Sequence, residues 1–454
     1  MFDTVLVANR GEIAVRILRA CQALSLRTVA VFSEADREAT HVKMADRSLC
    51  IGPAPAAQSY LDQAAVLFAA ELCGAQAVHP GYGFLSENAN FAQRVQDAGM
   101  TFIGPSPDNI RVMGDKVAAK RAMRAAGVPC VPGPDTALPE GPQAAFEAAR
   151  EAARDIGFPL ILKAAGGGGG RGMRVVRQES ELSGALAFTR EEARRTFGNA
   201  EIYVEKFLAG PRHVEIQVLA DAYGHALWLG SRDCSLQRRH QKLVEESPAP
   251  GIDLEAVTLL GERCVQACLQ LGYHGVGTFE FLYEDGHFHF IEMNTRLQVE
   301  HTVTEMTSGV DLVQQQIRVA RGEALNLRQT EVRCDGHAIE CRINAEDSLT
   351  FRPSPGTITH WQLPVGPGIR VDTHAHAGCR VSPHYDSLLA KLVVHGATRS
   401  EALQRMQQAL QVMEVQGIAT NLPLHRRLMS EPGFVAGGVD IHQLERWLQT
   451  RTAA

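Results

Sequence analysis

Short apolar runs alternate with longer amphipathic stretches along the first hundred residues. Residues 4–10 (TVLVANR) predict a strand, residues 11–25 (GEIAVRILRACQALS) an amphipathic helix, and residues 27–33 (RTVAVFS) a second strand. The same alternation continues through residues 44–112. Strands that alternate with helices predict an α/β fold built on a parallel sheet. The first turn, Asn9-Arg10-Gly11-Glu12, lacks the glycine fingerprint of a dinucleotide site, which argues against such a site there.

The pattern changes after residue 130. Residues 131–143 (VPGPDTALPEGPQ) are rich in proline and glycine and predict a hinge into a separate lobe at about 131–207. The remaining predictions are strands at 201–208, 212–221 and 225–230, a helix at 252–271, a hairpin at 277–294, and closing helices at 399–415 and 440–450. Some parts of the chain are therefore α+β in character.

Five consecutive glycines, Gly166–Gly170, lie between the apolar stretches 158–164 and 172–176. A flexible linker would usually mix glycine with serine between polar stretches. A glycine loop between two strands, with Arg171 beside it, instead favours backbone N–H groups that surround a phosphate. The Gly-Lys-Ser/Thr ending of a Walker loop is absent, so we expect a phosphate loop of another kind.

Polar residues recur at every second position where the predicted hairpin ends. Glu292, Asn294, Arg296, Gln298 and Glu300 fall on one face of an extended chain. A strand with one solvated face could have this pattern. The neighbouring runs FEFL and FHFI are strongly apolar, however, so the hairpin is expected to be buried. A buried row of acids, an amide and a guanidinium is costly unless it binds something.

Glu280 lies on the partner strand of that hairpin. A three-residue loop, Glu284-Asp285-Gly286, would place Glu280 opposite Phe290 and on the face of Glu292 and Asn294. A two-residue loop would place Glu280 on the other face. If the acids cooperate, the loop must therefore have an odd number of residues. Two carboxylates and an amide oxygen suit Mg²⁺ or Mn²⁺, with nucleotide phosphates completing the shell.

A second alternating strand places His213, Glu215 and Gln217 on one face, although a strand with one wet face is an equal alternative. Basic residues are dense at 238–242 and favour a local site for a phosphate or carboxylate. The pairs His287/His289 and His374/His376 lack a third zinc ligand at useful spacing, so we interpret them as strand or loop histidines.

The overall composition excludes several classes of protein. The chain has 454 residues, enough for several domains, and a net charge of −6, which offers no basic field for nucleic acid. Its first residues do not resemble a signal peptide, and no apolar run is long enough to span a membrane. Ten scattered cysteines without a C-x-x-C pair predict reduced thiols and a cytoplasmic location.

Several long motifs occur in order along nearly the whole chain. They are VANRGEIAVRILRA, HPGYGFLSEN, KAAGGGGGRGMRVV, RHVEIQVLAD, RDCSLQRRHQK, GTFEFL, IEMNTRLQVEH and ECRINAED. Together they closely resemble the biotin carboxylase family of the ATP-grasp superfamily. The resemblance implies a Rossmann-like N-terminal domain at 1–113, an ATP-grasp domain at 114–330 with a mobile glycine-rich lid at about 131–207, and a C-terminal biotin carboxylase domain at 331–447.

The resemblance also implies roles for individual residues. Those expected to bind ATP are Lys116, Lys163, Gly169, Gly170, Glu205, Lys206, Phe207, Leu208, His213 and His240. Glu280, Glu292 and Asn294 match the metal ligands. The residues that match the bicarbonate and biotin pocket are Lys242, Arg296, Gln298, Val299, Glu300, Arg342, Tyr82 and Gly83.

By the same resemblance, Glu300 is the general base that deprotonates bicarbonate while Arg296 holds it. Attack on the γ-phosphate of ATP gives carboxyphosphate, and Arg342 stabilises the biotin oxyanion that attacks CO₂. The chain has no Met-Lys-Met biotinylation motif, so we expect a separate carrier protein and separate carboxyltransferase subunits. The resemblance to the family also implies a homodimer. Acetyl-CoA carboxylase is the expected assembly. The alternatives are another acyl-CoA carboxylase, of propionyl or methylcrotonyl type, another ATP-grasp carboxylate ligase, and a regulatory subunit that binds nucleotide without turnover.

Two positions depart from the family pattern. Ser231 replaces an acid before RDCS, and Thr302 replaces a proline after QVEH. Neither is assigned to catalysis. Because Thr302 frees a backbone dihedral beside Glu300, we expect it to loosen that segment.

Overall fold

The computed structural model describes residues 1–134, 136–164 and 172–452. The N-terminal part contains β1 (Thr4–Val7), α1 (Gly11–Ala23), β2 (Arg27–Phe32), α2 (Thr40–Met44), β3 (Arg47–Cys50), α3 (Gln63–Cys73), β4 (Ala77–His79), α4 (Ala89–Asp97), β5 (Thr101–Phe102) and α5 (Pro107–Gly114). Its five strands form a parallel sheet in the order β3-β2-β1-β4-β5. The predicted α/β alternation is therefore confirmed.

The central strand β1 is buried on both faces, as parallel strands usually are. Val5 and Val7 pack into the cluster that contains Ile13 of α1, whereas Leu6 packs into a second cluster with Phe91 of α4. Alternate side chains of one strand thus fill two separate cores. This arrangement holds the turn after β1 in place. Glu12, which follows that turn, lines the central cavity.

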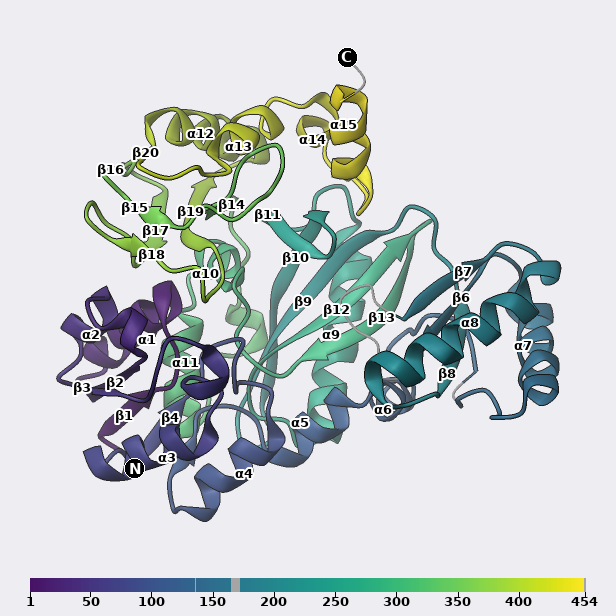
Figure 1. The fold of residues 1–454 in the computed structure, drawn as a ribbon, viewed down its shortest axis with the longest axis horizontal. Coiled ribbons are helices and arrows are strands. Elements are labelled where there is room, and N and C mark those ends of the chain that lie inside the picture. Colours follow the sequence, from purple (N-terminus) through teal and green to yellow (C-terminus); the bar gives the residue numbers. More distant parts are fainter. Residues whose placement is uncertain (135, 165–171, 453–454) are drawn as a thin grey trace.

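Helix α6 (Lys116–Ala125) leads to a lobe that projects to one side of the molecule (Figure 1). The lobe contains α7 (Pro142–Ile156), β6 (Leu160–Ala164), β7 (Met173–Val176), α8 (Glu179–Phe197) and β8 (Ile202–Lys206). Its strands form an antiparallel sheet in the order β7-β6-β8. The lobe has its own apolar core, which agrees with a separate unit there, and the expected bounds of about 131–207 remain a prediction. The five glycines and Arg171 lie outside the described residues.

A large antiparallel sheet forms the centre of the molecule, in the order β13-β12-β9-β10-β11-β14-β19-β17. Its strands are β9 (Arg212–Ala220), β10 (Ala226–Arg238), β11 (Gln241–Ser247), β12 (Gly275–Glu284), β13 (His287–Asn294), β14 (His337–Asn344), β17 (Ile369–Thr373) and β19 (Leu388–Gly396). Helices α9 (Leu254–Gln270), α10 (His301–Ser308) and α11 (Leu312–Ala320) pack against it. A domain boundary was expected at residue 330. Strands β11 and β14 pair directly across that position within one sheet, so the boundary remains a prediction.

The remaining elements lie at the top of Figure 1, around β14 and β19. They are β15 (Gly356–Thr357), β16 (His360–Gln362), β18 (Arg380–Val381), α12 (Arg399–Val412), β20 (Glu414–Gln416), α13 (Leu422–Leu428), α14 (Pro432–Ala436) and α15 (Gln443–Thr452). The predicted closing helices correspond to α12 and α15. Met406 and Leu410 of α12 pack with Leu392 of β19, which anchors this part to the central sheet.

The hairpin of β12 and β13 corrects one prediction. Its turn has two residues, Asp285 and Gly286, both with positive φ (50° and 81°), as a type I′ turn requires. That turn alone would place Glu280 and Glu292 on opposite faces. The register shifts by one residue between Glu280 and Phe281, however, and Glu280 pairs directly with Glu292. The predicted three-residue loop was wrong, and a β-bulge supplies the parity that the acids need.

The alternation beyond the hairpin also differs from the prediction. Strand β13 ends at Asn294, and residues 295–300 form irregular backbone before α10 begins. Arg296, Gln298 and Glu300 therefore do not share a strand face, although all three line the same cavity. In the three described ranges, no helix combines the length and apolarity needed to cross a membrane.

Candidate active site

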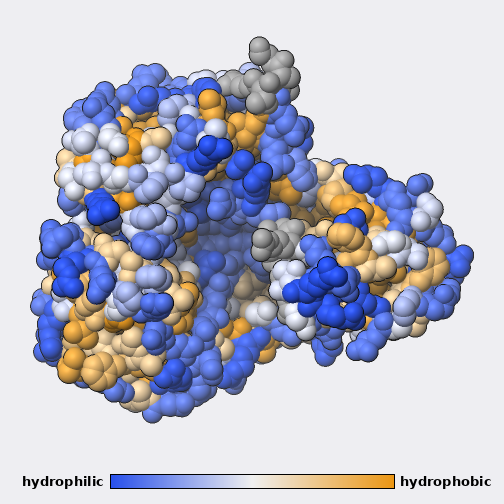
Figure 2. Space-filling view, viewed as in Figure 1, coloured by the Kyte–Doolittle hydropathy of each residue, from blue (hydrophilic) through white to orange (hydrophobic). Residues whose placement is uncertain are grey.

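One cavity of about 990 Å³ lies where the N-terminal part, the projecting lobe and the central sheet meet. Figure 2 shows a deep hollow with hydrophilic walls between these parts. Every predicted site residue that the structure describes lines this cavity. Gly169 and Gly170 lie outside the described residues. The predicted residues, which are spread along the chain from Tyr82 to Arg342, thus converge on one cavity.

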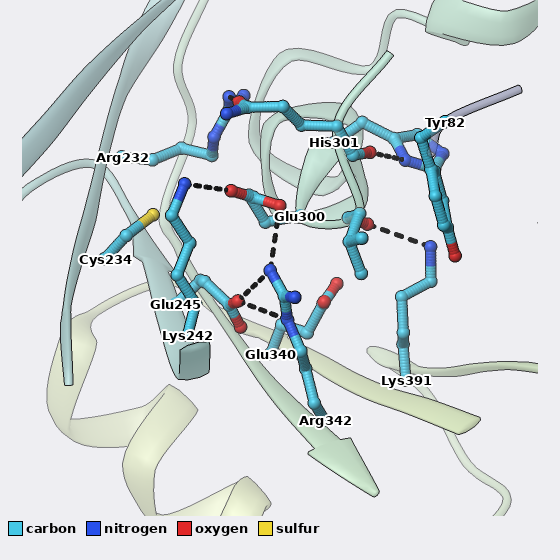
Figure 3. Close-up of polar contacts among 12 residues, drawn as sticks. Tyr82, Arg232, Cys234, Lys242, Glu245, Glu300, His301, Glu340, Arg342 and Lys391 are labelled. Atoms are coloured by element: carbon cyan, nitrogen blue, oxygen red, sulfur yellow. Dashed lines mark hydrogen bonds and ion pairs between the residues drawn. The ribbon is translucent and has the colours of Figure 1, made fainter. Parts of the chain in front are cut away.

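Glu300 lies at the centre of the polar contacts in this cavity (Figure 3). Its Oε1 accepts a hydrogen bond from Lys242 Nζ at 2.7 Å, and its Oε2 accepts one from Arg342 Nη2 at 2.9 Å. Burial alone would raise the pKa of Glu300, but Lys242 and Arg342 outweigh that effect and lower the pKa to about 2. Glu300 is therefore ionised at neutral pH and can accept a proton once its cationic partners turn to a substrate.

A second acid, Glu245, also binds the side chain of Arg342. Its Nε donates to Glu245 Oε1 at 2.6 Å, and Glu245 is fully buried on the neighbouring strand β11. Burial raises the pKa of Glu245 to about 7 although Arg342 opposes the change. The carbonyl of Arg342 accepts hydrogen bonds from Asn421 Nδ2 (2.9 Å) and His425 Nε2 (2.7 Å). Side chain and backbone of Arg342 are both fixed before any substrate arrives.

The hairpin acids form a pair beside this centre. Glu280 Oε1 accepts from Asn294 Nδ2 at 2.8 Å, and Glu280 Oε2 lies 3.2 Å from His213 Nε2. Burial and the charge of Glu280 raise the pKa of Glu292. Glu292 is exposed to the cavity, and two carboxylates opposite each other favour additional positive charge beside them. The set of Glu280, Glu292 and Asn294 oxygens therefore fits a hard cation such as Mg²⁺ or Mn²⁺.

Glu215 and Arg232 were missed as site residues by sequence reasoning. Both are fully buried, and Arg232 Nε donates to Glu215 Oε2 at 2.9 Å. Glu215 also accepts from Lys242, and Arg232 donates to Gln298. The alternation of His213, Glu215 and Gln217 was the available signal for Glu215. It was not decisive because an exposed strand face has the same pattern. Arg232 lies inside the RDCS motif.

Of the two lysines predicted to contact phosphates, Lys163 pairs with an acid, Glu205, where the lobe meets the cavity. Glu205 accepts from Lys163 Nζ at 2.6 Å and from Lys120 Nζ at 2.8 Å. Burial would raise the pKa of Glu205, but the two lysines lower it to about 2. Lys116 lines the same part of the cavity, as do Lys206, Phe207 and Leu208. Lys120 was not predicted and joins this group through α6.

Arg296 and Tyr82 connect the cavity to the N-terminal part. Arg296 Nε donates to Glu87 Oε2 at 3.0 Å, and its Nη2 donates to Asn294 Oδ1 at 2.7 Å. Tyr82 donates its hydroxyl hydrogen to Glu12. Gly83, with a φ of 65°, turns the chain between Tyr82 and the rest of the motif. Glu87, which lies in the HPGYGFLSEN motif, was another residue that the predictions missed.

The two departures from the family pattern have clear surroundings. Ser231 is buried, and its Oγ accepts a hydrogen bond from the amide of Ala249 at 3.2 Å. Thr302 is also buried, in the first turn of α10, and its hydroxyl donates to Glu340. The hydroxyl of Thr302 ties α10 to β14, and the expectation that Thr302 loosens its segment remains a prediction. His240, with a φ of 66°, lines the cavity from the β10–β11 turn.

The comparisons with known proteins agree with one another. Residues 1–110 match the family model "Biotin carboxylase, N-terminal domain", residues 115–328 match "Carbamoyl-phosphate synthase L chain, ATP binding domain", and residues 340–446 match "Biotin carboxylase C-terminal domain". The chain is 58% identical to a biotin carboxylase of Pseudomonas aeruginosa over 448 residues, and 57% identical to one of Haemophilus influenzae over 449 residues. Each match covers 99% of both chains.

Solved structures give the same result. The chain is similar to a biotin carboxylase from Campylobacter jejuni in complex with a β,γ-ATP analogue, with a TM-score of 0.93, 47% identity, and 98% and 99% of the two chains covered. It is also similar to the biotin carboxylase domain dimer of 2-oxoglutarate carboxylase from Hydrogenobacter thermophilus, bound to MgADP, ADP and bicarbonate. That match has a TM-score of 0.91, 46% identity, and 98% of each chain covered.

Proposed function

Because this chain belongs to the biotin carboxylase family and is an ATP-dependent ligase, we propose that it carboxylates biotin on a separate carrier protein, using ATP and bicarbonate. The observation that carries the proposal is Glu300, held between Lys242 and Arg342 in a cavity that also contains the hairpin acids. A base, an anion clamp and a cation site in one cavity are what bicarbonate activation by ATP requires.

Binding of the nucleotide is assigned to the residues that face the lobe. Lys116 and Lys163 would hold ATP phosphates, and Glu205 to Leu208 would hold the adenine, with His213 and His240 completing the site. Glu280, Glu292 and Asn294 would hold Mg²⁺ or Mn²⁺, which supplies positive charge to the transferring phosphoryl group. The assignment of Gly169 and Gly170 to the phosphates remains a prediction.

Activation of bicarbonate is assigned to Glu300. Arg296, Lys242, Gln298 and the Val299 backbone would orient the anion, and Glu300 would take its proton. A bicarbonate oxygen then attacks the γ-phosphorus, the bond to ADP breaks, and carboxyphosphate forms. Since Lys242 and Arg342 pair with Glu300 in this structure, their turning to the substrate's negative charge would raise its basicity at that moment.

Transfer to biotin follows in the same cavity. Carboxyphosphate separates into CO₂ and phosphate, the phosphate takes the ureido N–H proton of biotin, and the nitrogen attacks CO₂. Arg342 would stabilise the negative charge that develops on the ureido oxygen. Tyr82 and Gly83 would line the pocket from the N-terminal part. A dry, charged pocket protects carboxyphosphate from hydrolysis by bulk water.

The partners follow from this chemistry. We propose a biotin carboxyl carrier protein and carboxyltransferase subunits as separate chains, a homodimer, and acetyl-CoA carboxylase as the complete assembly in the cytoplasm. The relatives from Pseudomonas aeruginosa and Haemophilus influenzae are named biotin carboxylases and match this chain over 99% of their own length. The solved relatives include domains of 2-oxoglutarate and pyruvate carboxylases. The final acceptor is therefore to be determined with the transferase present.

The deciding experiment is ADP release with Mg²⁺ and bicarbonate, with and without free biotin. Release that depends on bicarbonate and rises with biotin is the expected result. Tight ATP binding without such stimulation would favour another carboxylate ligase or a silent nucleotide-binding subunit. Reversion of Ser231 and Thr302 to the family's residues would then be the first change to make.

A further inference from the structure

Lys391 lies directly behind the wall of the cavity. It is fully buried in β19 and does not line the cavity itself. Its ammonium group donates a hydrogen bond to the carbonyl of Val299 at 2.9 Å. Its Nζ also lies 3.2 Å from Glu12 Oε1. One buried charge thus contacts both the backbone beside Glu300 and the first helix of the chain.

The contacts of Lys391 join three distant parts of the sequence. Strand β19 belongs to the C-terminal part, Val299 lies in the irregular segment before α10, and Glu12 lies at the start of α1. Glu12 in turn accepts the hydroxyl hydrogen of Tyr82, which lines the cavity. A displacement of Lys391 would therefore shift both Val299 and Tyr82, which line the cavity from different parts of the chain.

The backbone before Glu300 is held at two successive carbonyl groups. The Gln298 carbonyl is 2.8 Å from His301 Nδ1, and the Val299 carbonyl receives Lys391. The Gln298 side chain is fixed as well, by donation to Glu280 Oε1 at 2.7 Å. These contacts define the direction in which the Glu300 carboxylate enters the cavity. Of these contacts, the one to Lys391 comes from β19, in the C-terminal part of the chain.

Stability alone gives little reason for this arrangement. The ion pair of Lys391 and Glu12 is buried, and the other ion pair of Lys391 within the described residues, with Asp372 Oδ2, is long at 4.0 Å. Glu12 Oε2 has no hydrogen-bond partner in the structure. A buried ion pair with imperfect partners stabilises a fold no better than a well-packed apolar pair. Its presence behind a reaction centre is better explained by a requirement for geometry.

We propose that Lys391 is a positioning residue for bicarbonate activation: it fixes the Val299 carbonyl, and with it Glu300, relative to Tyr82 and Glu12. This inference rests on the proposed function, because the reaction it serves is the one assigned there. Lys391 touches none of the reacting atoms and acts through the residues it holds. ATP binding, which uses the other end of the cavity, does not depend on it.

The test is the substitution Lys391→Met, which keeps an unbranched side chain one atom shorter and removes the donor. We expect kcat/KM for bicarbonate to fall by about 10- to 100-fold, whereas KM for ATP changes by less than ~3-fold. Hydrogen exchange should become faster in the peptide that covers residues 297–303. Lys43→Met, at an exposed lysine on the surface of the N-terminal part, is the matched control. It should leave kcat/KM for bicarbonate, KM for ATP and the hydrogen exchange of residues 297–303 unchanged.

A double variant separates positioning from charge balance. Lys391→Met leaves Glu12 as an uncompensated buried carboxylate, which could itself disturb the fold. Glu12→Gln with Lys391→Met removes both charges and should recover thermal stability, while the bicarbonate defect and the faster exchange at 297–303 remain. Full recovery of bicarbonate kinetics in the double variant would overturn the proposal, as would an equal loss for ATP and bicarbonate in Lys391→Met.

The exchange measurement also keeps the two proposals distinguishable. If the wild-type protein shows no bicarbonate-dependent ADP release, the proposed function fails. Faster exchange at residues 297–303 in both Lys391 variants would then still support the contact as the one that orders this segment. Unchanged exchange in both variants would exclude the positioning role, whatever the wild-type activity.

Discussion

Glu280 and Glu292 lie directly opposite each other on β12 and β13, although the two-residue turn that joins these strands would by itself place them on opposite faces. The one-residue register shift beside Glu280 reverses the parity and brings the two carboxylates together. β-Bulges are common where a strand must re-aim a side chain near an active site. The bulge is therefore a structural requirement of the cation site proposed here.

Glu292→Gln should weaken divalent cation binding in the presence of nucleotide. Loss of one anionic ligand is expected to reduce affinity by about 10- to 100-fold, because ligand charge sets the affinity of oxygen sites for hard cations. Titration with Mn²⁺, followed by electron paramagnetic resonance in the presence of ADP, measures this directly. Glu255→Gln, in the first turn of α9, is the control and should leave the Mn²⁺ affinity unchanged. Equal affinities for wild type and Glu292→Gln would remove Glu292 from the site.

Glu300→Gln should abolish bicarbonate-dependent ADP release while leaving nucleotide binding intact. A glutamine keeps the volume and one acceptor but cannot take a proton, and removal of a general base costs about 10²- to 10⁴-fold in rate. The rate is measured at saturating bicarbonate, and ATP affinity is measured by equilibrium titration of the same preparation. Turnover at the wild-type rate would exclude Glu300 as the base.

Thr302→Val should destabilise the protein. The hydroxyl donates to Glu340, which is fully buried and whose pKa is raised well above its ordinary value by burial and by the charge of Glu245. Loss of a donor to a buried acceptor costs about 1–3 kcal/mol of the free energy of unfolding. Denaturant unfolding measures this difference. Thr258→Val, whose hydroxyl donates only to the Leu254 carbonyl of its own helix, is the control. Equal losses in the two variants would contradict a specific role for the Thr302 contact.

Acidification should destabilise the fold partly through His425. Burial lowers the pKa of His425 from 6.5 to about 4, so the unfolded chain binds this proton more readily than the folded one. The contribution is fully present above pH 6.5 and is lost as pH falls toward 4, by up to about 3 kcal/mol. His425→Gln should therefore lose less stability than wild type between these pH values. Parallel pH profiles of unfolding for the two proteins would show that His425 does not contribute.

Much of the fold follows from local pattern. The βαβ opening was predictable because parallel strands are apolar on both faces and the helix between them is amphipathic. The hairpin was predictable because the apolar runs FEFL and FHFI flank the turn residues Asp285 and Gly286. The bulge was not, because a one-residue shift depends on how Ile291 and its neighbours pack in three dimensions and leaves no periodic signal.

The partners of the site residues were harder to predict than the residues themselves. Glu87 meets Arg296 across more than 200 positions, and Glu12 meets Lys391 across nearly 380. Such pairs form only after separate parts of the chain have docked, and no spacing rule connects them. Arg232 is the clearest case, since an arginine inside a strand usually predicts an edge and not a fully buried guanidinium.

Four cations of the cavity are matched with the protein's own carboxylates: Lys242 with Glu300, Arg342 with Glu245, Arg296 with Glu87, and Lys163 with Glu205. A substrate anion that binds one of these four groups must therefore displace an internal counterion. Abundant monovalent anions such as chloride, which offer a single charge and no fixed hydrogen-bonding geometry, should compete poorly for these positions. Without substrate, these cations are therefore shielded from binding the anions of the surrounding salt solution.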